Sequence, residues 1–218
     1  MPGLLAPHRA RRDPGELLVG RAGAALTPAV DRVIVVRAPG QELPPLPAGI
    51  AVTEDARPGR GPLEGLVAGL GALRHGEDAF ALAVDMPFAE AELAAAVLAA
   101  LGPDADAAVP RADGRAQPLA AAYRAGVAAT ARGLLDSGRP RMGDLLGAIR
   151  VAWLDAAALP GGARALLNVN TPEELAAARR AADQAMREYA TTSPAATPPG
   201  GTSASASEPV SDVTAWAP

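Results

Sequence analysis

The sequence predicts an α/β domain with a single doubly wound, mostly parallel β-sheet that is flanked by helices. Short apolar runs alternate along the chain with segments of helical periodicity, as expected for such folds. The runs are continuously apolar, which is typical of strands covered on both faces. The composition is 49% hydrophobic but only 3% aromatic, so the core of this 218-residue chain is expected to consist mainly of Ala, Leu and Val.

The apolar runs give the predicted strands, which are bounded by turn-forming residues. They are Arg32–Val36, Ile50–Thr53, Ala79–Val84, Ala107–Val109, Pro118–Tyr123 and Ile149–Leu154. The first of them, RVIVV, is rich in β-branched residues, which favour an extended strand.

Three helices are predicted between and after these strands. In Leu63–Leu73 and Glu90–Leu101, leucine and valine recur at helical spacing on one face. A third helix is predicted to begin at the motif TPEE, residues 171–174, and to run to about Tyr189. In that motif the threonine is expected to cap the helix, the proline to take its first position and a glutamate to return the capping bond.

The chain divides into a folded part and a tail. Residues 1–190 are predicted to form the α/β domain. Residues 191–218 are rich in Pro, Ser, Thr and Ala and lack apolar periodicity. Such a segment does not bury enough apolar surface to offset the entropy of ordering it, so a disordered tail is predicted.

Charge and hydropathy exclude several function classes. The net charge of −4 argues against a nucleic-acid-binding protein, because phosphate contacts require clustered basic residues. No apolar stretch is long enough to span a membrane. In the N-terminal MPGLLAPHRARR the arginines follow the short apolar piece, which is the wrong order for a secretory signal. We therefore expect a cytoplasmic protein without nucleic-acid or membrane partners.

The residue types also restrict the metal chemistry. The chain has no cysteine and only two histidines, which excludes thiolate sites and argues against a multi-histidine site. Hard cations held by carboxylates are left, with Mg²⁺ as the leading case. All twenty basic residues are arginine. Any phosphate group must therefore be met by arginine or by the backbone.

Asp85 stands at the end of the apolar run Ala79–Val84. In an open α/β sheet, ligands bind outside the carboxyl ends of the strands, so this carboxylate is placed at the ligand edge. A turn or capping aspartate would be the ordinary explanation. A Mg²⁺ ligand that bridges substrate phosphates is the sharper hypothesis.

Two further segments follow predicted strands or precede a helix. Asp55 follows Ile50–Thr53 and leads into a loop whose Gly61 and Pro62 stand at a helix N-terminus. The free N–H groups there suit an anionic or carbonyl-bearing ligand, although an ordinary Gly/Pro turn explains the spacing equally well. Asn168 and Asn170 precede the last helix, where they either cap it or present two amides on one side of an extended segment.

Four segments resemble one known family. They are PGRGPLEGLVAGL, LAVDMPF, AAVPRADGRAQPLAAAYR and LLNVNTPEEL, in this order between about Val30 and Ala182. In sequence and spacing they are similar to the molybdenum cofactor guanylyltransferases of the nucleotidyltransferase superfamily. The resemblance implies a Rossmann-like nucleotidyltransferase fold. It also implies transfer of GMP from GTP to the terminal phosphate of molybdopterin, release of pyrophosphate and a requirement for Mg²⁺.

The resemblance assigns roles to individual residues. Asp85, the aspartate of DMPF, is implied as the catalytic metal ligand. Asp55 is implied to contact the nucleotide beside Gly61 and Pro62, and the NxNTP motif is implied to lie towards the pterin, with Asn168 and Asn170. The implied substrates are GTP and molybdopterin, and the implied protein partners are molybdoenzymes or cofactor-delivery proteins.

The glycine-rich phosphate loop of that family, LAGGxSxRMGxDK, is degenerate in this chain. The corresponding stretch reads LAPHRARRDPG, residues 5–15, in which Pro and His replace two glycines and Pro14 replaces the lysine. Proline has no N–H to donate, so the loop loses phosphate-binding groups. Arginine can pair with phosphate instead, although a solvated basic terminus would explain these arginines equally well. Among them, Arg12 is expected to be catalytic. The residues of this loop expected to bind substrate are Leu5, Ala6, Arg11 and Arg12.

These observations leave three hypotheses. The first is a working guanylyltransferase with an arginine-based phosphate site. The second is a catalytically impaired relative that acts as a nucleotide-binding, cofactor-binding or partner module. The third is a sibling nucleotidyltransferase that uses CTP or another acceptor. The four downstream motifs favour the first hypothesis.

Overall fold

The structure is a computed structural model, and it describes residues 19, 22–57, 59–74, 76–169, 171, 173–174 and 212–216. The strands in this part of the chain are β1 Val33–Arg37, β2 Ala51–Glu54, β3 Asp78–Ala83, β4 Ala107–Ala112, β5 Arg115–Ala116, β6 Ala120–Arg124, β7 Val151–Asp155 and β8 Asp212–Trp216. The α-helices are α2 Pro62–Gly71, α3 Ala91–Ala99, α4 Val127–Asp136 and α5 Met142–Leu146. The 3₁₀ helices are η1 Thr27–Ala29, η2 Ala156–Ala158 and η3 Gly162–Leu166.

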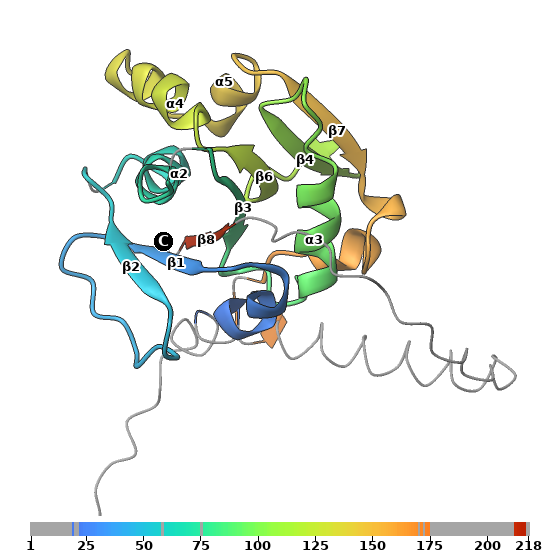
Figure 1. The fold of residues 1–218 in the computed structure, drawn as a ribbon, viewed down its shortest axis with the longest axis horizontal. Coiled ribbons are helices and arrows are strands. Elements are labelled where there is room, and N and C mark those ends of the chain that lie inside the picture. Colours follow the sequence, from blue (N-terminus) through green and yellow to red (C-terminus); the bar gives the residue numbers. More distant parts are fainter. Residues whose placement is uncertain are drawn as a thin grey trace, which may run out of the picture.

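The strands form one mixed sheet with helices on both faces (Figure 1). Its order is β2-β1-β8-β3-β6-β4-β5, and β7 pairs with β4 beside this path. β2, β1, β8 and β3 are parallel to one another, whereas β6 runs antiparallel to both β3 and β4. The predicted α/β fold, with a sheet between helices, is confirmed, and the antiparallel strands β5 and β6 are its departures from a parallel order.

The reversal of the chain before β6 comes from a tight hairpin. Asp113 and Gly114 both adopt positive φ angles, +49° and +75°, and Asp-Gly is a favoured pair for a two-residue hairpin turn. β4 and β5 pair antiparallel across this turn, with Arg111 opposite Ala116. A short connection can join only antiparallel neighbours, since parallel strands need a long crossover.

The six predicted strands and the first two predicted helices are confirmed, with small shifts at their ends. The capping motif of the third helix is also present: the Glu174 N–H donates to Thr171 Oγ1 (3.1 Å), and the Thr171 N–H donates to Glu174 Oε2 (3.2 Å). The rest of that helix lies outside the described residues. None of the helices in the described part of the chain has the length and hydropathy that crossing a bilayer requires.

The core has two layers, one on each face of the sheet. On one face α3 packs against Phe80 and Leu82 of β3. On the other face α2, α4 and α5 pack against Ala79 and Ala81 of the same strand (Figure 1). Alternate β3 residues therefore face opposite layers, as the pleat requires. The buried core consists mainly of Ala, Leu and Val, as predicted.

β8 is the strand that joins the two parts of the sheet. It lies between β1 and β3, parallel to both, with Val35 of β1 and Leu82 of β3 opposite Ala215. For these five residues the structure differs from the predicted disordered tail; the rest of that segment lies outside the described residues. Two neighbouring strand edges offer backbone donors and acceptors on both sides of β8, which satisfies its own N–H and C=O groups.

Candidate functional site

Asp85 lies in the turn that follows β3, at the carboxyl edge of the sheet. Its main-chain oxygen accepts a hydrogen bond from the Val169 N–H (2.7 Å), and its Oδ2 accepts one from Asn168 Nδ2 (3.2 Å). Its Oδ1 is buried and has no hydrogen-bond partner among the described residues. A buried carboxylate oxygen without a donor is costly, so this atom marks a place where a positively charged ligand would be bound.

The electrostatic surroundings of Asp85 agree with this. Burial raises the pKa of the Asp85 carboxyl above its ordinary value, and a backbone hydrogen bond of the same residue lowers it by less. Without a bound cation, desolvation therefore disfavours the charged form of the Asp85 carboxyl. A cation beside Oδ1 would reverse this preference, because an opposite charge stabilises the carboxylate.

Asp55 lies at the same edge of the sheet as Asp85. It follows β2, and its N–H donates to the Arg37 carbonyl at the end of β1 (2.9 Å). Because β2, β1, β8 and β3 are parallel, their carboxyl ends meet at one edge. The structure thus brings both predicted aspartates to the edge where α/β sheets bind ligands.

The loop between β2 and α2 places a helix N-terminus at this edge. Gly61 is the N-cap residue of α2 with a φ of +75°, and Pro62 is the first helical residue. Two arginines of the loop are anchored elsewhere: Arg57 pairs with Asp136 (3.1 Å), and Arg60 donates to the Leu135 carbonyl (3.1 Å). They hold the loop against α4, and the N-terminal N–H groups of α2 are what the loop presents to a ligand.

The asparagine pair and the N-terminal residues are only partly described. Asn168 contacts Asp85 directly, so its amide orients the carboxylate, a role that the sequence did not predict. Asn170 lies outside the described residues, as do Leu5, Ala6, Arg11 and Arg12. Their predicted roles stay predictions.

Sequence reasoning also missed Arg164. Its guanidinium carbon lies 5.0 Å from the centre of the Phe88 ring, and Phe88 belongs to the same turn as Asp85. Arg164 is in η3, and η3 leads directly to Asn168. Its position four residues before that asparagine is the signal that could have singled it out.

The residues at Asp85 fit a Mg²⁺ ion. Within the described ranges there is no group of three or more His, Cys, Asp or Glu side chains that could hold a metal ion by itself. Asp85 offers one free buried oxygen. Mg²⁺ is commonly bound by one or two carboxylates, while waters and substrate phosphates complete its coordination. A single carboxylate therefore suits a Mg²⁺ ion that arrives with a nucleotide.

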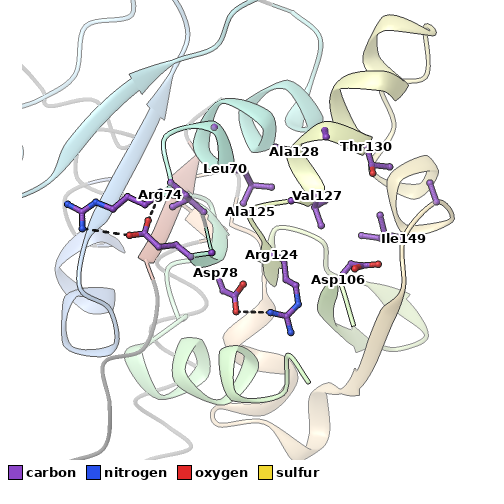
Figure 2. Close-up of a pocket in the computed structure, with 17 residues that line it drawn as sticks. Leu70, Arg74, Asp78, Asp106, Arg124, Ala125, Val127, Ala128, Thr130 and Ile149 are labelled. Carbon is purple, nitrogen blue, oxygen red and sulfur yellow. Dashed lines mark hydrogen bonds and ion pairs between the residues drawn. The ribbon is translucent and has the colours of Figure 1, made fainter. Parts of the chain in front are cut away.

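A cavity lies at the opposite, amino edge of the sheet. It has a volume of about 700 Å³, and its walls include Asp78, Asp106 and Arg124 (Figure 2). Leu70, Val127 and Ile149 add apolar surface. Burial raises the pKa of Asp78, and Arg124 lowers it by less.

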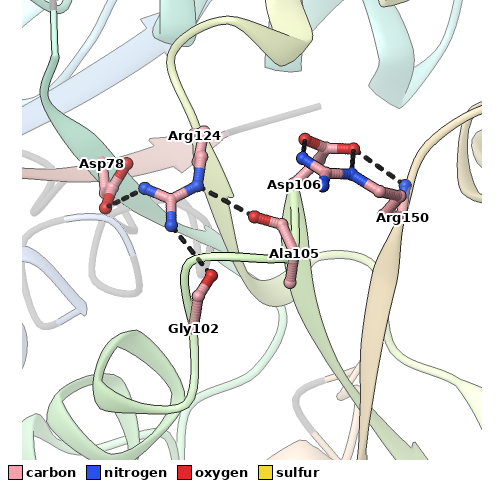
Figure 3. Close-up of polar contacts among 6 residues, drawn as sticks. All are labelled: Asp78, Gly102, Ala105, Asp106, Arg124 and Arg150. Carbon is pink, nitrogen blue, oxygen red and sulfur yellow. Dashed lines mark hydrogen bonds and ion pairs between the residues drawn. The ribbon is translucent and has the colours of Figure 1, made fainter.

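The charged walls of this cavity are paired with one another or with the backbone. Arg124 lies 3.4 Å from Asp78 and donates to the carbonyls of Gly102 (2.9 Å) and Ala105 (2.8 Å) (Figure 3). Arg150 makes a two-pronged contact with Asp106 (2.8 and 3.1 Å). These charged groups already have partners, so the cavity is a weaker candidate for a ligand site than the turn at Asp85.

The chain is similar in sequence to known proteins. Residues 10–150 match the MobA-like NTP transferase domain. The chain belongs to this family. A probable molybdenum cofactor guanylyltransferase of Chloroflexus aggregans is 35% identical over 176 residues, 74% of this chain and 78% of that protein. One of Mycobacterium tuberculosis is 36% identical over 162 residues, 72% of this chain and 74% of that protein.

Solved structures share the fold of this MobA-like chain. Molybdopterin-guanine dinucleotide biosynthesis protein A of Archaeoglobus fulgidus has a TM-score of 0.62 at 20% identity, covering 77% of this chain and 86% of its own. A putative protein of Aquifex aeolicus has a TM-score of 0.60 at 18% identity, covering 76% and 89%. The resemblance based on four motifs is thus confirmed at the level of the family, and the chain is a nucleotidyltransferase.

Proposed function

We propose that this nucleotidyltransferase transfers GMP from GTP to molybdopterin and releases pyrophosphate, with Mg²⁺ bound at Asp85. The observation that carries the proposal is the buried Oδ1 of Asp85, which has no partner in the described part of the chain and lies at the carboxyl edge of the sheet. The names of the two relatives above supply the substrates. The product would then pass to molybdoenzymes or cofactor-delivery proteins.

The reaction is a displacement at the α-phosphorus of GTP. An oxygen of the terminal phosphate of molybdopterin forms a bond to this phosphorus, and the bond from the phosphorus to the α–β bridging oxygen breaks, so that pyrophosphate leaves. Such a reaction needs positioning and charge neutralisation more than covalent help from the protein. When bound, Mg²⁺ would neutralise phosphate oxygens and the charge that develops on pyrophosphate.

The residues of the chain hold the participants in place. Asp85 would bind the cation through Oδ1, while Asn168 fixes the orientation of the carboxylate through Oδ2. The Val169 N–H fixes the backbone of the same turn. Asp55 and the N-terminus of α2 would receive the nucleotide on the neighbouring part of the edge.

A pyrophosphate-release assay tests the proposal. The purified chain is mixed with molybdopterin, Mg²⁺ and either GTP or CTP, and release is compared with a reaction that lacks molybdopterin. We expect release that depends on molybdopterin and on Mg²⁺ and that is faster with GTP. Faster release with CTP would indicate the sibling activity. Binding of GTP with Mg²⁺ but no release with either nucleotide would indicate the impaired, binding-module alternative.

A further inference from the structure

Arg164 is bound to the same turn as the proposed metal ligand. Its guanidinium lies over the Phe88 ring, 5.0 Å from the ring centre, within the range of a cation–π contact. Three points of contact join its segment to the turn after β3. They are the Val169 N–H to the Asp85 carbonyl (2.7 Å), Asn168 Nδ2 to Asp85 Oδ2 (3.2 Å) and the Arg164–Phe88 stack. The guanidinium is thus held in a defined place near Asp85.

Arg164 differs from most arginines around it in its partner. Seven described ion pairs join an arginine to a carboxylate, at Arg32, Arg37, Arg57, Arg74, Arg124, Arg139 and Arg150. In the described part of the chain Arg164 contacts an aromatic ring and no carboxylate. It is also exposed to solvent. Stacking leaves the N–H groups in the guanidinium plane available, and their fork matches the oxygens of a phosphate.

The N-terminus of α2 and the η3 segment with Arg164 lie on opposite faces of the sheet. Leu63, in the first turn of α2, belongs to the core layer of α2 and α4. Ala165 and Leu166 of η3 belong to the layer of α3, on the other face. Asp85 lies between them, at the end of β3. A nucleotide at the N-terminus of α2 would therefore leave the η3 side of Asp85 for the second substrate.

We propose that Arg164 binds the phosphate of the acceptor and thereby positions its attacking oxygen beside the cation on Asp85. This inference rests on the proposed function and names a residue that recognises the acceptor. The chain has no lysine, so arginine is its only side chain with a permanent positive charge that can pair with a phosphate dianion. Phe88 positions the guanidinium by stacking.

The test compares acceptor binding with nucleotide binding in the full chain. Arg164→Ala is expected to raise both KM and Kd for molybdopterin by about tenfold or more, because a charge-assisted contact is lost. The Kd for GTP with Mg²⁺ should not change. Arg164→Lys, which keeps the charge, should restore part of the affinity. Phe88→Leu should weaken molybdopterin binding less than Arg164→Ala does, since it removes only the stacking partner.

Arg111→Ala is the matched control. Arg111 also stacks on an aromatic ring, with its guanidinium carbon 3.6 Å from the centre of Trp153, and it has no described contact with the Asp85 turn. The Arg111→Ala variant should bind molybdopterin with the same Kd as the wild type. An equal loss in both alanine variants would overturn the proposal, because charge alone would then explain the effect. An unchanged molybdopterin Kd in Arg164→Ala, or an equal loss of GTP binding, would overturn it as well.

Direct binding keeps this inference separate from the proposed function. If the wild type binds molybdopterin but releases no pyrophosphate, the proposed reaction fails, while the Kd comparison still decides the role of Arg164. If the wild type does not bind molybdopterin at all, both proposals are overturned.

Discussion

The two edges of the sheet carry carboxylates in opposite situations. At the amino edge, Asp78 and Asp106 each meet an arginine, at 3.4 Å and 2.8 Å. At the carboxyl edge, Asp85 has one buried oxygen with no donor among the described residues. A cavity of about 700 Å³ lies at the amino edge, whose charges are paired.

This contrast is the reason why we place the proposed reaction at the carboxyl edge. A hollow whose polar walls are satisfied by one another offers a ligand little beyond apolar surface. A buried carboxylate oxygen without a hydrogen-bond donor has lost its hydration and gained no partner. A bound cation would compensate for this loss. The carboxyl edge is also where the parallel strands end and where α/β folds bind their ligands. The unpaired carboxylate oxygen, rather than the presence of a cavity, is therefore the reason to propose the site at Asp85.

The largest expected effect is at Asp85. Asp85→Asn should lower the rate of pyrophosphate release by about a thousandfold or more, because loss of a metal contact costs several kcal/mol of transition-state stabilisation. Thermal unfolding without Mg²⁺ should show no loss of stability. The raised pKa means that the charged carboxylate is disfavoured in the folded protein, and the neutral amide removes that cost.

Asp78→Asn is the matched change at the other edge. It weakens a pair with Arg124 and touches nothing near Asp85, so turnover per folded molecule should match that of the wild type. If it lowered turnover as strongly as Asp85→Asn does, the contrast between the edges would be wrong.

The second prediction concerns the strand that connects the two parts of the sheet. Thr214→Pro removes a backbone N–H from the middle of β8, between β1 and β3, where the ladder is parallel on both sides. We expect a loss of at least about 2 kcal/mol in the free energy of unfolding, because backbone partners are left without a bond. For a chain of this size that corresponds to a fall of about 4–8 °C in Tm.

Ser205→Pro is the control, in the same segment but outside β8. It should leave Tm unchanged. If Thr214→Pro also leaves Tm unchanged, residues 212–216 do not stabilise the sheet, and the sequence-based expectation of a disordered tail would be supported instead.

Much of the fold and part of the site follow from sequence. The strand RVIVV and the run before Asp85 are continuously apolar, and their spacing predicts buried strands that end at a ligand edge. β8 could not be predicted, because DVTAW lies in a segment of Pro, Ser and Thr and gains its stability from the edges of β1 and β3, which are distant in sequence. The Asn168–Asp85 hydrogen bond is likewise a tertiary contact between residues that are distant in sequence, so no local sequence pattern predicts it.

The third prediction concerns the amino edge. Arg124→Ala removes a guanidinium that donates to two carbonyls and pairs with Asp78, and all these contacts are partly buried. We expect a loss of about 2 kcal/mol in the free energy of unfolding. Turnover per folded molecule should stay at the wild-type level.

Arg74→Ala is the control for this change. Arg74 lines the same cavity, but its side chain is 84% exposed and lies 3.9 Å from Glu77. Its removal should change the stability little. Equal destabilisation by both variants would show that the buried contacts of Arg124 contribute nothing specific.

The smallest expected effect is the acid sensitivity of the exposed Asp106–Arg150 pair. Hydrogen bonds from Arg150 lower the pKa of Asp106 from 3.8 to about 2. A carboxyl with a lowered pKa contributes stability above its unfolded value and loses it as the pH falls through the folded value. In urea unfolding at neutral pH, the wild type should therefore have a larger free energy of unfolding than Asp106→Asn. The difference between the two should disappear as the pH falls from about 4 to about 2.

The contribution of Asp85 to stability should depend on pH in the opposite direction to that of Asp106. Its pKa is raised in the folded protein, so its contribution to stability is present at low pH and is lost as the pH rises. In the absence of Mg²⁺, the free energy of unfolding of Asp85→Asn should therefore increase relative to that of the wild type as the pH rises. That of Asp106→Asn should decrease relative to the wild type over the same change. High salt should reduce the Asp106 effect, which comes from an exposed pair, more than the Asp85 effect, which comes from burial. Parallel pH profiles for the two variants would contradict the assignment of paired and unpaired carboxylates to the two edges.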